Sequence, residues 1–172
     1  MFQKASDGEF DLIKDFYWNL IDSMSEQNDT IGWKKGIYPS DSFLQESLSN
    51  GELFTLRNRD RLYGCVVLNS QCNEGYADVP WSLNCAAEEI LIPHALAISP
   101  EQQGNGIGKK LVEEILQYAK SENKKAVRLD ILGTNIVAEK LYTKCGFLFV
   151  QAKTMFYEDT GWTEYKMFER NL

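Results

Sequence analysis

A glycine-rich stretch, Ile98 to Lys109, constrains this chain more than any other part of its sequence. An apolar run from Ile90 to Ile98 leads into it. After it, apolar residues recur at helical spacing, at Ile107, Leu111, Val112, Ile115, Leu116 and Ala119. The pattern predicts a strand, a tight turn and an amphipathic helix. Glycines let backbone approach a ligand, and the first N–H groups of a helix carry partial positive charge. The turn therefore predicts a site for a phosphate or pyrophosphate.

Two common phosphate-binding motifs do not fit this stretch. A Walker loop requires a glycine, four further residues, and then Gly-Lys followed by Ser or Thr. Here Gln103 stands where the first glycine is needed, and Gly108 is followed by Lys109-Lys110, which offers no hydroxyl for magnesium. The dinucleotide fingerprint would need a third glycine at position 109, which is lysine. A nucleotide-binding protein is therefore the weaker interpretation.

Two other motifs do fit, and they stand in one order along the chain. Gln103-Gly104-Asn105-Gly106-Ile107-Gly108 matches the pattern Gln/Arg-x-x-Gly-x-Gly/Ala. The segment from Asn135 to Phe147 matches Asn-x-x-Ala-x-x-Leu-Tyr-x-x-x-Gly-Phe. With these two motifs one helix and one strand apart, the chain resembles the GCN5-related N-acetyltransferases, the GNAT superfamily. The resemblance runs from about Glu89 to the C-terminus, and more loosely over the whole chain.

The resemblance implies an α/β fold in a single domain over residues 1–172, a length that suits one domain. It implies a mixed, mostly antiparallel twisted sheet of about six to seven strands flanked by helices. The sheet is expected to splay open between the strand ending at Ile98 and the strand ending at Leu132, with acetyl-CoA in the opening. Because Pro93 interrupts the first of these strands, that strand is expected to be an edge strand or to carry a bulge.

Local patterns predict the remaining elements. A capping box at Ser6 to Glu9 opens a first helix, and Ser40 caps a second helix that stops at Asn50-Gly51. Residues 25–30 and 69–86 are expected to be mainly loops. Two β-rich runs at 53–57 and 62–68 indicate a hairpin. A further strand is expected at 126–132, a short helix after Asn135 that ends at Gly146, and two antiparallel strands at 147–155 and 163–168.

The resemblance also implies which residues bind the cosubstrate acetyl-CoA. Main-chain groups of Leu96, Ala97 and Ile98 would pair with the pantetheine, and an amide there would hold the thioester oxygen. Asn135 would point toward the pantetheine. The pyrophosphate would lie on Gln103, Gly104, Asn105, Gly106, Ile107, Gly108 and Lys109.

Acetyl transfer to an amine requires a base, an oxyanion site and an acid. A free alkylamine has a pKa near ~10.4, so its proton must be accepted directly or through water. His94 and Glu89, with Glu88 beside it, are the candidate bases, and a water relay is the alternative. Tyr142 resembles the tyrosine that protonates the departing thiolate in many family members; the alternative is that it only packs or hydrogen-bonds.

Four further residues have competing interpretations. Trp33 and Tyr38 either pin their loop to the core or line an acceptor pocket. Asp130 is expected to make structural or surface hydrogen bonds rather than to act in catalysis. Cys145 would need a lowered thiol pKa and a nearby base to carry the acetyl group, and nothing in the sequence indicates either. Direct transfer is therefore preferred.

Composition limits the classes of binding partner that this chain can have. Lys and Arg number 18 against 25 Asp and Glu, a formal net charge of −7, which argues against nucleic-acid binding. The sequence shows no signal peptide and no membrane-spanning stretch, so a cytoplasmic protein with reduced cysteines is expected. His94 is the single histidine, and the cysteines form no Cys-x-x-Cys pair, so no metal site is predicted.

These observations lead to one functional hypothesis with stated alternatives. The chain is expected to be an acetyl-CoA-dependent N-acetyltransferase that acts by direct attack of a primary amine. The acceptor would be a small molecule or a peptide amine, shaped by residues 25–49 and 69–87, and a homodimer is one option in this family. The alternatives are another acyl-CoA or nucleophile, and a non-catalytic acetyl-CoA sensor.

Overall fold

The structure is a computed structural model that describes residues 1–26 and 32–172. Its backbone contacts divide the chain into two compact units. The first comprises Met1–Leu68 and His94–Leu111, and the second comprises Asn69–Pro93 and Val112–Leu172. One strand and one helix contribute residues to both units. The expectation of a single domain over residues 1–172 stays a prediction.

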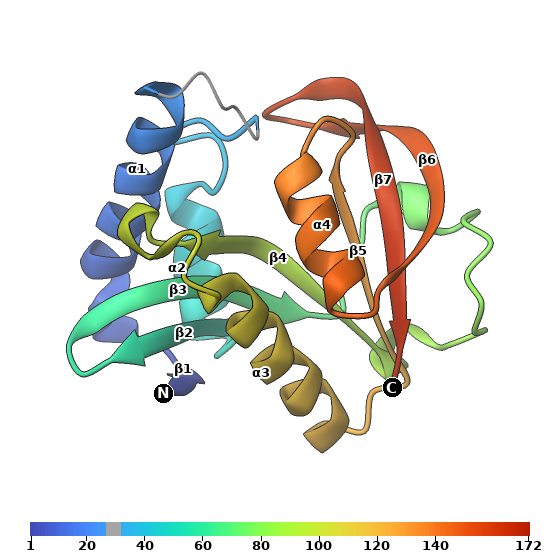
Figure 1. The fold of residues 1–172 in the computed structure, drawn as a ribbon, viewed down its shortest axis with the longest axis horizontal. Coiled ribbons are helices and arrows are strands. Elements are labelled where there is room, and N and C mark those ends of the chain that lie inside the picture. The colour runs from blue at the N-terminus through green and yellow to red at the C-terminus, as the bar shows by residue number, and fades with distance from the viewer. Residues whose placement is uncertain (27–31) are drawn as a thin grey trace. The chain divides into compact units, whose positions relative to one another are not determined.

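Seven strands form one mixed sheet in the order β1-β2-β3-β4-β5-β7-β6 (Figure 1). β4 pairs with β5 in parallel, whereas β1–β2, β2–β3, β5–β7 and β6–β7 are antiparallel. The predicted mixed, mostly antiparallel α/β architecture is thereby confirmed. The strands are β1 (Phe2–Lys4), β2 (Leu53–Asn58), β3 (Arg61–Asn69), β4 (Ile90–Ile98), β5 (Ala126–Leu132), β6 (Leu148–Tyr157) and β7 (Gly161–Asn171). The α-helices are α1 (Phe10–Glu26), α2 (Asp41–Ser49), α3 (Ile107–Ser121) and α4 (Ile136–Lys144).

The ladder between β4 and β5 is short. It comprises two residue pairs, Ile90 with Ala126 and Leu91 with Val127, although both strands continue for several residues beyond them. Of the two alternatives predicted from Pro93, the edge strand is wrong, because β4 lies between β3 and β5 in the sheet order. The alternative of a bulge in this strand stays a prediction. Pro93 is tolerated because it follows the last pair of this ladder, so its missing N–H interrupts none of the ladder's bonds.

In the first unit, α1 and α2 lie side by side and pack on the sheet (Figure 1). The capping box is present: the Ser6 N–H donates to Glu9 Oε2 at 2.8 Å, and a 3-10 turn at Asp7–Glu9 leads into α1. α1 continues to Glu26, so the predicted loop is wrong at residues 25 and 26, and its remainder lies outside the described residues. Buried side chains from α1, α2, β2, β3 and β4 form one core: Ile13, Phe16, Tyr17, Leu20, Leu44, Leu48, Leu53, Cys65, Val67, Ala95 and Ala97.

Capping and turn residues set the limits of α2 and of the hairpin after it. The Phe43 N–H donates to Ser40 Oγ at 3.1 Å, which starts α2 as predicted. Gly51 has a φ of 65°, a conformation that suits glycine immediately after a helix. β2 and β3 are joined by a two-residue turn at residues 59 and 60, which confirms the predicted hairpin.

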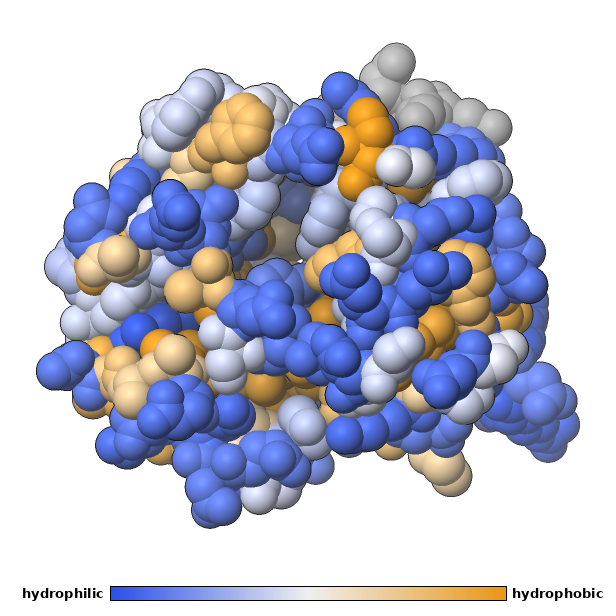
Figure 2. Space-filling view, turned by 180° about the vertical axis from the view of Figure 1, so that it is seen from behind, coloured by the Kyte–Doolittle hydropathy of each residue, from blue (hydrophilic) through white to orange (hydrophobic). Residues whose placement is uncertain are grey.

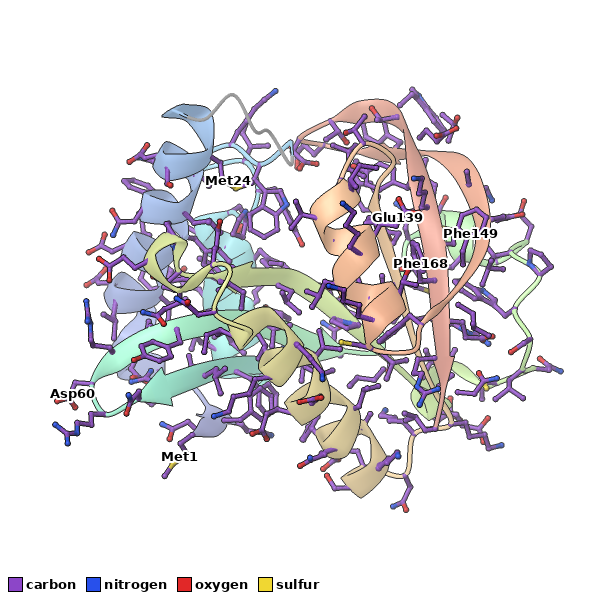
Figure 3. All side chains as sticks on the ribbon, viewed as in Figure 1. Met1, Met24, Asp60, Glu139, Phe149 and Phe168 are labelled. Carbon is purple, nitrogen blue, oxygen red and sulfur yellow. The ribbon has the colours of Figure 1, made fainter. Side chains whose placement is uncertain are left out.

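In the second unit, β5, β7 and β6 form an antiparallel sheet, and β6 and β7 make a long hairpin (Figure 1). Phe149 of β6 and Phe168 of β7 lie close together, with ring centroids 5.8 Å apart (Figure 3). Glu139 on α4 pairs with Lys166 of β7 at 2.6 Å. Buried side chains of the second unit form another core: Tyr76, Val79, Ile90, Ile92, Met155, Tyr165 and Met167.

The face of the molecule drawn in Figure 2 is mostly polar. Figure 2 shows a face on which hydrophilic residues predominate and apolar residues occur in small groups. Within the described ranges, no helix combines the length and apolar character needed to cross a bilayer.

Candidate functional site

The glycine-rich stretch forms a turn of exposed backbone between β4 and α3. A 3-10 turn at Pro100–Gln102 follows β4, and the Gln102 N–H donates to the Ser99 carbonyl at 2.8 Å. Gly104 and Gly106 have φ values of 78° and 77°, which L side chains rarely adopt. Nothing lies within 4 Å of where a Cβ would stand on either glycine. Backbone conformation therefore accounts for these two glycines, and the space above them is open.

The start of α3 differs from the starts of the other α-helices in the described residues. α1, α2 and α4 each carry an acidic residue in the first turn, namely Asp11, Asp41 and Glu139. α3 carries none, and its first turn contains Lys109 and Lys110 instead. The partial positive charge of a helix N-terminus normally favours acidic side chains. A first turn that carries lysines and no acidic residue suits an anion.

Close packing in the first unit holds β4 against β3 next to this turn. A Cβ on Gly64 of β3 would stand 3.0 Å from the Ala97 carbonyl oxygen and 3.0 Å from Leu111 Cδ2. A side chain at this position would therefore have to displace the Ala97 carbonyl or the side chain of Leu111. This contact positions Ala97, one of the residues expected to bind the pantetheine. Leu96 and Ile98 are half-buried on either side of it.

The second motif lies in the second unit, at the start of α4. Asn135 is the N-cap: its Oδ1 accepts the Ala138 N–H at 3.0 Å. Its backbone N–H donates to the Leu132 carbonyl at 2.8 Å, which ties the start of α4 to the end of β5. Asn135 thus caps α4, and its expected contact with the pantetheine stays a prediction.

Tyr142 is buried on α4. Its ring packs edge-on against Phe147, with centroids 5.3 Å apart, and only 6% of the residue is exposed. Burial, with smaller contributions from Cys145 and Asp130, raises the pKa of Tyr142 well above its ordinary value. The phenol therefore stays protonated at neutral pH, as a proton donor must.

Asp130 of β5 is held by two tyrosines that the sequence did not single out. Its Oδ2 accepts the hydroxyls of Tyr76 at 2.9 Å and Tyr157 at 2.8 Å, which confirms the expected structural hydrogen bonding. Burial raises the pKa of Asp130, although both hydrogen bonds oppose that shift. Tyr76 comes from the connection and Tyr157 from the end of β6, so no local pattern could have brought the three together.

The candidate bases have different surroundings. Glu89 pairs with Lys125 Nζ at 2.6 Å and accepts the Ala86 N–H at 3.0 Å; the Lys125 contact is the main cause that lowers its pKa. A lowered pKa makes a carboxylate a poorer proton acceptor. Glu88 is exposed. His94 is half-buried in β4, directly after Pro93.

Trp33 and Tyr38 belong to an aromatic cluster in the first unit. Trp33 packs against Tyr17 and Tyr38 with centroids 6.0 and 5.8 Å apart, and Tyr38 packs against Phe43 at 5.5 Å. Both residues are partly buried against the core of that unit. The prediction that they pin their loop to the core is confirmed, and a role in acceptor binding stays a prediction. Within residues 1–26 and 32–172, no three His, Cys, Asp or Glu side chains gather as a metal site.

Comparisons with known proteins agree with these observations. The family model for the GNAT acetyltransferase family matches residues 15–147. Over 74 residues the chain is 32% identical to the N-alpha-acetyltransferase RimI of Mycobacterium tuberculosis, a match that covers 43% of this chain and 45% of that protein. The chain spans less than half the length of the curated relatives it matches.

Solved structures show the same fold. A GNAT-family acetyltransferase from Listeria monocytogenes superposes with a TM-score of 0.76 at 15% identity, over 100% of this chain and 94% of the other. An acetyltransferase of Salmonella typhimurium, solved with its cofactor acetyl-CoA, gives a TM-score of 0.69 at 13% identity, over 100% of this chain and 93% of that one. Because the family model covers most of the sequence, the chain belongs to the GNAT acetyltransferase family.

Proposed function

We propose that this protein is an acetyl-CoA-dependent N-acetyltransferase that transfers an acetyl group to a primary amine by direct attack. The observation that carries the proposal is the turn from Gln103 to Gly106 with the start of α3. Its exposed glycines and its first helical turn with lysines and no acid suit the pyrophosphate of acetyl-CoA. When bound, acetyl-CoA supplies an activated acyl carbon.

In this proposal each binding residue acts through its backbone or one polar group. The backbone of residues 103–109 holds the pyrophosphate, although the N–H groups of Gln103 and Asn105 donate to carbonyls within the turn, and Lys109 adds positive charge. The peptide groups of Leu96, Ala97 and Ile98 bind the pantetheine, and one N–H among them stabilises the oxyanion. Asn135 binds the pantetheine through the side-chain N–H₂ that its capping Oδ1 leaves available.

Tyr142 is proposed as the acid that protonates the departing thiolate. Its raised pKa keeps the proton on the phenol throughout the physiological range. Direct transfer is proposed in preference to an acetyl-cysteine intermediate at Cys145, because nothing in the sequence around Cys145 indicates the nearby base that such a route would need.

His94 is the stronger of the two proposed bases. Histidine is a common general base, whereas the Glu89 carboxylate is engaged by Lys125 and a backbone N–H. Transfer of the amine proton through water to either group is the alternative. A His94→Ala variant with unchanged kcat/KM would remove His94 from consideration.

The first experiment measures release of the CoA thiol from acetyl-CoA with a panel of amines, polyamines, amino acids, aminoglycosides and peptides. Amine-dependent release supports the proposed reaction and names the acceptor class. Binding of acetyl-CoA without release by any amine favours the sensor alternative. Release with a longer acyl-CoA but not with acetyl-CoA favours the alternative acyl donor. Absence of binding in calorimetry contradicts the assignment of the glycine turn.

Gly106→Ala tests the glycine turn, and Gly161→Ala is its matched control. Both glycines have positive φ, 77° and 66°, and neither has an atom within 4 Å of its Cβ position. Both substitutions therefore introduce similar strain of about 1–2 kcal/mol. Only Gly106→Ala is expected to weaken acetyl-CoA binding, by about tenfold, because only that residue lies in the proposed pyrophosphate site. Equal effects of the two variants would contradict this assignment.

Three further expectations belong to the proposal. The acceptor is a small-molecule or peptide amine and not a nucleic acid, in keeping with the formal net charge of −7. A cytoplasmic location and a homodimer also stay predictions. Size-exclusion chromatography with light scattering measures the oligomeric state directly.

A further inference from the structure

The backbone of β4 has an unusual conformation at Ala95. Of the described non-glycine residues, Arg59, Ala95 and Asn123 have positive φ. Arg59 lies in the hairpin turn and Asn123 follows α3, places where such values are common. Ala95 has a φ of 50° inside a strand. An L residue in this conformation is strained, so neighbouring groups must hold it there.

Tyr17 of α1 contacts this position directly. Its hydroxyl donates a hydrogen bond to the Ala95 carbonyl oxygen at 2.8 Å, and both groups are buried. The Tyr17 ring is fixed in turn by Phe16 and Trp33, with centroids 5.8 and 6.0 Å away. Burial keeps the pKa of Tyr17 far above neutral, so its hydroxyl remains a donor. The strained peptide is therefore held by a rigid, permanently protonated side chain.

The position of this contact along β4 gives it a functional consequence. The peptide that follows Ala95 leads into Leu96, Ala97 and Ile98, whose backbone groups are assigned to acetyl-CoA under the proposed function. A change of φ and ψ at Ala95 rotates those peptide groups. The close approach of Gly64 to the Ala97 carbonyl leaves the strand little room to compensate elsewhere.

We propose that Tyr17 is a positioning residue: its hydrogen bond to the Ala95 carbonyl holds β4 in the conformation that directs the following peptide groups toward acetyl-CoA. This inference rests on the proposed function. Tyr17 touches neither substrate in this role. It acts through Ala95. A residue at position 95 that adopts positive φ without strain should therefore compensate in part for loss of the Tyr17 hydroxyl.

Tyr17→Phe removes the hydroxyl and keeps the ring in the core. Acetyl-CoA binding is expected to weaken about tenfold, and kcat/KM for acetyl-CoA to fall at least as much, because the strand relaxes from its positive φ. Ile13→Val is the matched control, since Ile13 lies one turn earlier on α1 and is fully buried in the same core. It lowers stability by removal of a buried methyl group and breaks no hydrogen bond to β4, so the variant's dissociation constant for acetyl-CoA and its kcat should equal those of the wild type.

Ala95→Gly supplies the rescue, because glycine adopts positive φ without a Cβ penalty. The double variant Tyr17→Phe/Ala95→Gly is expected to bind acetyl-CoA at least threefold more tightly than Tyr17→Phe. If Tyr17→Phe alone does not fold, the double variant is compared with Ala95→Gly. This comparison measures the effect of the Tyr17 hydroxyl on acetyl-CoA binding when glycine stands at position 95. There the proposal predicts less than a threefold difference, and a larger one overturns it.

The outcomes separate this inference from the proposed function. If the wild type binds acetyl-CoA and Tyr17→Phe binds it equally well, the positioning role is overturned and the proposed function stands. If Tyr17→Phe is impaired and Ala95→Gly restores nothing, the route through Ala95 is overturned. If the wild type does not bind acetyl-CoA, both fail together. Impairment by Tyr17→Phe, rescue by Ala95→Gly and a silent Ile13→Val together support the inference.

Discussion

Glu169→Ala is predicted to lower the free energy of unfolding by more than the loss of an exposed ion pair would. Glu169 of β7 and Arg128 of β5 pair at 2.9 Å with side chains only 3% and 6% exposed. Glu169 Oε2 also accepts the N–H of Ser82 at 2.8 Å and its hydroxyl. The Arg128 guanidinium lies 4.6 Å from the Trp81 ring centroid and donates to the Leu83 carbonyl at 2.5 Å. The pair thus anchors residues 81–83 to the sheet.

The size of this loss of stability follows from the burial of the ion pair. Removal of one partner of a buried ion pair leaves the other charge without compensation and costs about 3–5 kcal/mol. With an unfolding entropy of about 2.1 cal/mol/K per residue, 172 residues give about 0.36 kcal/mol/K. A loss of about 4 kcal/mol therefore corresponds to a fall in Tm of about 11 °C.

Urea unfolding followed by far-ultraviolet circular dichroism measures this loss, and Glu101→Ala is the control. Glu101 pairs with Arg61 at the same 2.9 Å, but those side chains are 70% and 71% exposed. Solvent screens such a pair, so Glu101→Ala should cost less than about 1 kcal/mol. Arg128→Met/Glu169→Leu should recover part of the loss, because no charge stays buried. Equal losses for Glu169→Ala and Glu101→Ala would refute the reasoning from burial.

Three further variants test other parts of the structure. Tyr142→Phe should lower kcat about 100-fold with little change in KM for acetyl-CoA. The wild type should keep its rate up to about pH 10, because the pKa of Tyr142 is raised. Full turnover of the variant in the CoA-release assay would contradict the role of Tyr142 as the acid. Burial raises the pKa of Asp130, so the folded protein binds this proton more tightly than the unfolded chain, and the contribution of Asp130 to the free energy of unfolding falls as pH rises above 3.8. Asp130→Asn should remove that fall. Parallel curves of the free energy of unfolding against pH for wild type and variant, between about pH 3.5 and 6, would disprove this assignment. Gly64→Ala should cost about 1–3 kcal/mol in thermal unfolding because its Cβ would press on the Ala97 carbonyl, whereas Gly8→Ala, with no atom within 4 Å, should be nearly neutral.

Local signals predicted most elements because the groups that end a helix or turn a hairpin are neighbours in sequence. Ser40 starts α2 through its own side chain, and Gly51 follows that helix in the left-handed region. The glycine turn, α3 and β5 were likewise found from periodicity and turn chemistry. The loop predicted from Ser25 was wrong at its first two residues, since α1 continues to Glu26 despite their polarity. Polar residues at a helix end are compatible with helix, so composition alone misplaces such a boundary.

The candidate site was predictable only where one motif contains it. The turn at residues 103–109 and the segment from Asn135 to Tyr142 are each continuous in sequence, so their residue types could be read together. The contact between Tyr17 and Ala95 joins residues 78 positions apart, and that between Tyr76 and Asp130 joins residues 54 apart. Tyr17 occupies an apolar helix face, where a tyrosine gives no sign of its hydroxyl's partner.

By itself, the sequence indicated the family and the order of most elements, and it predicted that the glycine turn binds an anion. These depend on spacing, on helix ends and on glycine's backbone freedom, which act over a few residues. Only the tertiary structure decided that Ala95 is held at positive φ, that Glu89 is engaged by Lys125, and that Arg128 is buried against Glu169. Those states depend on burial and on partners distant in sequence, because desolvation and hydrogen-bond satisfaction are set by packing.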